Sequence, residues 1–200
     1  LPSPTVAAPC AVADLERDLE RVIALSWRVA ETGVDDAVPT AIARAATVDL
    51  VVARDGSLDT AGPEVADLAT LAPKTLTSLA LAEDQAAFLG DYWAAGQPAE
   101  TELRLQLEQV AQLHRKRAEA LVAMSSEPDP RAVAYELPPP TTSIEATRTA
   151  WGEVELRLAT HYGALPLGSA AEPFLSWQLV QAHTWGVAVP ALPFIDSIPA

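Results

Sequence analysis

The sequence predicts an all-α protein, an up-down four-helix bundle with an N-terminal helical extension. Apolar residues recur at three- and four-residue spacing through four long segments, which is the pattern of amphipathic helices. Prolines and glycines interrupt this pattern between the segments, and a long proline-rich stretch separates the second segment from the third. Two short loops and one long connection between four helices are typical of a helical bundle.

The chain of 200 residues divides into three predicted parts. Residues 1–10 form a flexible, proline-rich leader of the kind that follows a removed signal peptide, so we expect an exported protein that is extracytoplasmic or associated with the cell envelope. Residues 11–73 form the extension packed on the bundle, with helices expected over 15–31 and 39–54 and turns over 56–73. Residues 74–200 form the four-helix bundle.

Start and stop signals delimit the four bundle helices, which we expect over 74–95, 99–125, 143–165 and about 170–187. Gly96 and Pro98 end the first of them, and Ser143 is suited to cap the third. The connection over 125–142 contains five prolines and cannot continue a helix.

Composition excludes several classes of partner. Asp and Glu number 27 against 13 Lys and Arg, a net charge of -14 that repels nucleic acid and anionic membrane surfaces. No apolar run approaches the roughly 20 residues that span a bilayer, so we expect no transmembrane segment. Cys10 is the single cysteine, which excludes an internal disulfide and leaves its modification open.

Four ionisable residues fall on the predicted inward faces, one from each bundle helix. Glu83 lies among small residues, His114 continues an apolar stripe, Glu155 flanks another stripe, and His183 aligns with Leu175 and Leu179. Buried carboxylates and imidazoles are costly unless they are paired or bind a metal. We therefore take Glu83, His114, Glu155 and His183 as candidate metal ligands.

A two-metal centre is not expected from these residues. A di-iron carboxylate bundle takes a Glu-x-x-His motif from each of two helices, and the positions three residues before His114 and His183 hold Ala111 and Val180. Three interpretations stay open: a buried Glu83–His114 pair that fixes helix register, a single iron, manganese or zinc ion on two His and one or two Glu, or catalysis by these groups. We expect the first, with no cofactor and no catalytic residue.

Several stretches resemble a family of actinobacterial ferritin-like proteins of unknown function. They are "LAEDQAAFLGDYWAA", "LHRKRAEALVA", "AVAYELPPPTTSIEATRTAWGEVELRLATHYGAL" and the ending "VPALPF", within about residues 76–195. The resemblance implies a ferritin-like four-helix bundle, often exported, and implies no activity. Glu83 and His114 match the family's pattern, whereas Asp84 stands where a His often follows the Glu, which weakens a metal site.

These observations lead to two expected functions. The first is a non-enzymatic binding or structural module of the cell envelope that lacks a complete di-iron site. The alternative is a metal-binding redox or iron-handling protein that uses the inward Glu and His. The sequence does not identify a partner, and a homodimer or a cell-envelope protein partner both fit it.

Overall fold

The computed structural model describes residues 62–165 and 172–188, which form one short 3-10 helix and four long α-helices. The 3-10 helix η1 covers Val65–Leu68. The α-helices are α3 over Pro73–Ala95, α4 over Glu102–Met124, α5 over Ile144–Gly163 and α6 over Glu172–Thr184. The prediction of an all-α bundle is confirmed, while the leader and residues 11–61 of the predicted extension lie outside the described residues.

Local signals account for where the helices begin. Pro73 occupies the first turn of α3, where its missing N–H costs nothing. The Thr101 hydroxyl accepts a hydrogen bond from the Arg104 backbone N–H at 3.4 Å, which starts α4 three residues later than predicted. The Ser143 hydroxyl accepts one from the Ala146 N–H at 3.0 Å, which confirms the predicted cap of α5.

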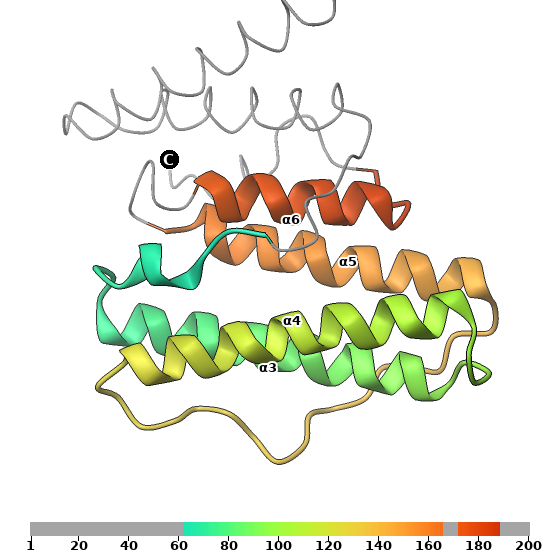
Figure 1. The fold of residues 1–200 in the computed structure, drawn as a ribbon, viewed down its shortest axis with the longest axis horizontal. Coiled ribbons are helices and arrows are strands. Elements are labelled where there is room, and N and C mark those ends of the chain that lie inside the picture. The colour runs from blue at the N-terminus through green and yellow to red at the C-terminus, as the bar shows by residue number, and fades with distance from the viewer. Residues whose placement is uncertain (1–61, 166–171, 189–200) are drawn as a thin grey trace, which may run out of the picture.

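The helices form two antiparallel pairs, α3 with α4 and α5 with α6 (Figure 1). Residues 125–143, which we call the strap, run back along the bundle, so α5 points in the same direction as α4 (Figure 1). The buried clusters agree: the start of α3 and the end of α4 share one cluster with the end of α5 and the start of α6. The up-down order therefore holds within each pair, but the predicted up-down order of the whole bundle is wrong, because the strap, the one long crossover among the described elements, makes α4 and α5 parallel.

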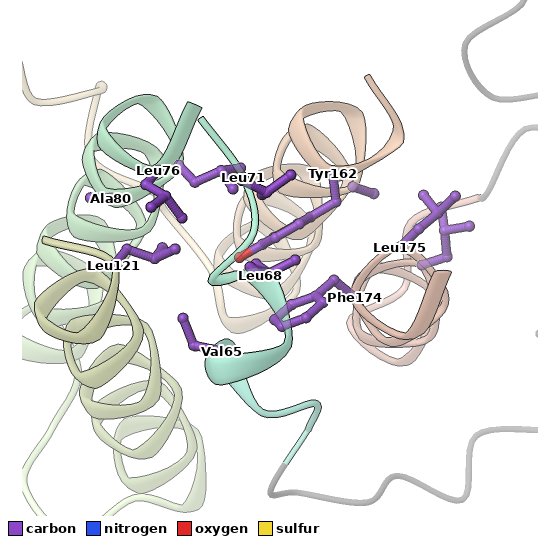
Figure 2. Close-up of a cluster of buried hydrophobic side chains, with 12 residues drawn as sticks. Val65, Leu68, Leu71, Leu76, Ala80, Leu121, Tyr162, Phe174 and Leu175 are labelled. Atoms are coloured by element: carbon purple, nitrogen blue, oxygen red, sulfur yellow. The ribbon is translucent and has the colours of Figure 1, made fainter. Parts of the chain in front are cut away.

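One end of the bundle is closed by residues 62–72. Val65, Leu68 and Leu71 are buried there beside Tyr162 and Phe174. Figure 2 shows Leu68 in the space between the α3–α4 pair and the α5–α6 pair. These leucines thus fill a gap that the four helices alone would leave, and apolar burial of this kind stabilises the fold.

The opposite end is filled by indole rings. Trp93 and Trp185 each lie edge-on to Trp151, with ring centroids 6.3 and 6.2 Å apart. Edge-to-face packing at this separation is a favourable arrangement of aromatic rings. No helix among the described residues has the length and apolar character needed to cross a bilayer.

The middle of the α3–α4 pair is tightly packed at Gly90. A Cβ added to Gly90 would lie 2.8 Å from the Ala111 Cβ and 3.2 Å from the Trp151 ring. Contacts that short are not tolerated, so the absence of a side chain at Gly90 is what allows α3 and α4 to approach here. This approach brings the polar side chains of the two helices together one or two turns away.

Candidate functional site: a buried charged cluster

Glu83 from α3, His114 from α4 and Glu155 from α5 meet in the interior of the bundle, and each of them is fully buried. The His114 Nδ1 lies 2.5 Å from Glu83 Oε2, and its Nε2 lies 3.4 Å from Glu155 Oε1. The imidazole therefore bridges two carboxylates, one on each side of the ring. We call these three residues, together with Arg117 and Tyr162, the central cluster.

Arg117 is the second positive charge of the central cluster. Its Nη1 lies 4.0 Å from Glu83 Oε1, and its guanidinium lies over the Trp177 ring at 4.3 Å from the centroid. Its three nitrogens are buried without a hydrogen-bond partner, so ring stacking and the Glu83 charge are its compensation for lost water. Gly62, at a φ of 65°, lies against this guanidinium, and a Cβ there would collide with Nη2.

Tyr162 completes the cluster from the last turn of α5. Its hydroxyl donates a hydrogen bond to Glu83 Oε1, so both oxygens of this carboxylate are engaged. Burial, with the adjacent charge of Glu83, raises the pKa of Tyr162 well above its usual value, which keeps the phenol neutral. The ring also stacks on Phe174, with centroids 4.8 Å apart.

The charges set the protonation states of the cluster. Burial alone would lower the pKa of His114, but the negative charges of Glu155 and Glu83 outweigh it and raise this pKa to about 9. Burial alone would raise the pKa of Glu83, but the charge of His114, its hydrogen bond and Arg117 lower it below the usual value. At neutral pH the protonated imidazole of His114 thus lies between Glu83 and Glu155, and the guanidinium of Arg117 lies beside Glu83.

The fourth predicted ligand, His183, lies apart from this arrangement. It stands in the last turn of α6 and is half-buried, and within the described part of the chain its side chain has no hydrogen bond or ion pair. Leu175 and Leu179, with which the sequence aligned it, are both fully buried. On α6, the indole of Trp177 lies edge-on to the His114 ring, with centroids 6.2 Å apart.

The donor set does not fit a pair of metal ions. Ala111 is fully buried and apolar, and Val180 is apolar, at the two positions that would supply bridging carboxylates. Both ring nitrogens of His114 face carboxylates, and a protonated imidazole has no lone pair on either nitrogen with which to bind a cation. Among residues 62–165 and 172–188, no three or more His, Cys, Asp or Glu side chains are grouped to hold a metal ion. A single iron, manganese or zinc ion stays a prediction.

Access to the central cluster is also closed. The four hollows described over residues 62–165 and 172–188 are lined by other side chains, and the fully buried Glu83, His114 and Glu155 contribute to none of these linings. Catalysis requires a reacting group within hydrogen-bond reach of a substrate. The cluster as described is therefore a closed ionic network.

Comparisons of the chain with protein-family models, with characterised proteins and with solved structures gave no match. The resemblance to actinobacterial ferritin-like proteins accordingly stays a prediction. The site has to be interpreted from its own geometry.

Proposed function

We propose that this chain is a non-enzymatic binding or structural module built on a ferritin-like bundle without a complete di-iron site. One observation carries the proposal: His114 lies between Glu83 and Glu155 with both ring nitrogens occupied, and Arg117 balances the remaining charge. The single long crossover supports the ferritin-like part, since that class of four-helix bundle has one such connection.

The central cluster has a structural role in this proposal. It joins three helices through hydrogen bonds between fully buried side chains, and separating these charges by a shift of one helix would be costly. A single buried polar contact is known to select register in packed helices. Carboxylates and a histidine could also line the interior of a metal-binding bundle. In this proposal the positive charges beside the carboxylates are those of His114 and Arg117.

Metal analysis of protein purified without chelators, after growth with iron, manganese and zinc, tests the proposal. We expect less than stoichiometric metal and a thermal unfolding midpoint that EDTA does not change. The variant His161→Ala, which removes an exposed histidine on α5, controls for surface binding.

The competing function is the metal-binding redox or iron-handling protein that would use Glu83, His114, Glu155 and His183. About one equivalent of bound metal that is retained in His161→Ala and lost in His114→Ala would replace our proposal with this one. The expected export and a homodimer or cell-envelope partner stay predictions.

A further inference from the structure

A hollow lies between α3, α5 and the strap, away from the central cluster. Its volume is about 270 Å³. The apolar side chains that line it are those of Ala82, Ala86, Leu89, Val154 and Leu158, four of them buried. Polar side chains also line it: Gln85, Tyr135, Glu136, Arg157 and His161. Small-molecule sites generally combine such an apolar interior with a few polar groups.

The strap that borders this hollow is attached to α3 at two points. The Tyr135 hydroxyl donates a 2.6 Å hydrogen bond to Asp84, and its ring lies edge-on to Phe88 at 5.4 Å. Further along, the Tyr92 hydroxyl donates to the Pro138 carbonyl at 3.4 Å. Glu136 and Leu137 lie between these two attachments, so the hollow has a border that is held in place before a ligand arrives.

Arg157, which also lines a neighbouring hollow beside Trp93 and Leu137, differs from the other arginines of the described ranges in its lack of a partner. The other five arginines of the described ranges each have a bonded or charged partner, as follows: Arg104 with Glu108, Arg115 with Asp91, Arg117 with Glu83, Arg131 with Asp129, and Arg148 with Gln106 and Thr184. Arg157 has no hydrogen bond or ion pair within these ranges. Glu153 lies one turn before it and Glu136 lines the same hollow, yet neither pairs with it.

His161 adds a second donor one helical turn after Arg157. It is exposed, lines the same hollow, and likewise has no hydrogen bond or ion pair among the described residues. Residues four apart on a helix lie on the same face, so both side chains can reach one ligand group. A guanidinium binds a carboxylate through two parallel hydrogen bonds, which an imidazole N–H can supplement.

We propose that this hollow binds a small organic monocarboxylate, with its carboxylate held by Arg157 and His161 and its apolar body against Ala86 and Leu158. We expect the ligand to carry a single negative charge, because Glu136 in the lining and the net charge of -14 disfavour polyanions. We expect the rest of the ligand to be apolar, because small and aliphatic side chains form the buried part of the lining. This proposal gives a ligand class to the binding module proposed above.

Titration with octanoate, followed by isothermal calorimetry and by the NMR signal of the Arg157 Nε–H, tests the proposal. We expect one octanoate per chain, a shift of the Arg157 signal, and affinity for octanol at least about tenfold weaker, since a charge-assisted bond is lost. Arg157→Gln should weaken octanoate binding at least about tenfold, and Ala86→Leu should weaken it by filling the interior. Arg104→Gln, which removes a partly exposed arginine of α4, should bind octanoate as the native chain does.

Three results would overturn the proposal: no binding at millimolar octanoate, equal binding of octanoate and octanol, or unchanged binding in Arg157→Gln. Circular dichroism establishes whether each variant is folded. If a variant is unfolded, the Arg157 Nε–H signal of the native chain shows whether octanoate binds at Arg157. Failure here is distinguishable from failure of the proposed function, because that function is tested by metal content and this site by octanoate.

Discussion

Two histidine–arginine pairs, each within about one helical turn, lie in opposite surroundings in this bundle. His114 and Arg117 on α4 are buried and face the carboxylates of Glu83 and Glu155. Arg157 and His161 on α5 are exposed beside an apolar hollow and have no such partner in the described ranges. We call the central cluster the closed site and the hollow beside Arg157 and His161 the open site. The same two residue types occur in both, and the difference is whether carboxylates face them.

The largest effect on stability is expected from removing the His114 side chain from the closed site. His114→Ala leaves Glu83 and Glu155 buried with only Arg117 to balance them, which should lower the free energy of unfolding by about 3–5 kcal/mol. Urea denaturation at pH 7, followed by tryptophan fluorescence, measures this loss. Arg115→Ala removes the neighbouring exposed partner of Asp91 and should cost less than about 1 kcal/mol. Equal losses in the two variants would show that the buried charges do not hold the bundle together.

A pH series sharpens the contrast, because the carboxylates on both sides of the buried His114 displace its pKa. The folded pKa of about 9 lies above the unfolded value of about 6.5, so the stabilisation is complete below pH 6.5 and is lost as the pH rises through 9. At about 1.4 kcal/mol per pKa unit the total is about 3 kcal/mol. Urea denaturation between pH 6 and pH 10 measures it, and His114→Gln should remove the decline. A native chain as stable at pH 10 as at pH 6 contradicts the proposed charge on His114.

A smaller effect is expected from the packing that supports the closed site. Gly90→Ala places a Cβ 2.8 Å from that of Ala111, and relieving the overlap should cost about 1–3 kcal/mol. Gly96→Ala is the matched control, since its Cβ would meet nothing closer than 3.5 Å and its φ is -76°. Thermal unfolding compares the two variants. A midpoint for Gly90→Ala at or above that of Gly96→Ala would mean that α3 and α4 are not in close contact there.

The smallest effect is expected at the open site. Arg157→Gln should change the free energy of unfolding by less than about 0.5 kcal/mol, because Arg157 has no bond to lose among the described residues. Arg117→Gln, by contrast, removes a buried charge beside Glu83 and should be clearly destabilising. Urea denaturation of both variants makes the comparison. A large loss of unfolding free energy in Arg157→Gln would show that Arg157 stabilises the fold.

Much of this architecture could be predicted because it depends on local signals. Apolar spacing, Pro73, Ser143 and the prolines of the strap located the four helices to within a few residues. The same spacing brought Glu83, His114 and Glu155 to inward positions, which the structure confirms. A helical face is a local property, so a sequence can define it.

The remaining parts of the site depend on how the helices rotate against one another. A strict four-residue step aligns His183 with Leu175 and Leu179, but such a step drifts about 40° per repeat around a helix with 3.6 residues per turn. Ala182 is fully buried while His183 is only half-buried. Arg117 was not singled out because buried arginines are rare, although its position three residues after His114 could have indicated the shared face.

The hollow beside the strap could not be predicted from local patterns. Its shape depends on the contact of Tyr135 with Asp84, residues 51 positions apart in the chain. The amphipathic pattern of α5 does not indicate whether Arg157 forms an ion pair with a carboxylate. Such a site follows only from the positions of several elements in three dimensions.

The close contact at Gly90 constrains how this chain could change in evolution. Ala111 is where a di-iron bundle would carry a carboxylate, and here its methyl group lies against the backbone of α3. A glutamate at that position would force the two helices apart and would pull Glu83 away from His114. We therefore expect that replacing Ala111 by glutamate cannot by itself create a two-metal centre here, because the same replacement would displace the ligands that such a centre needs.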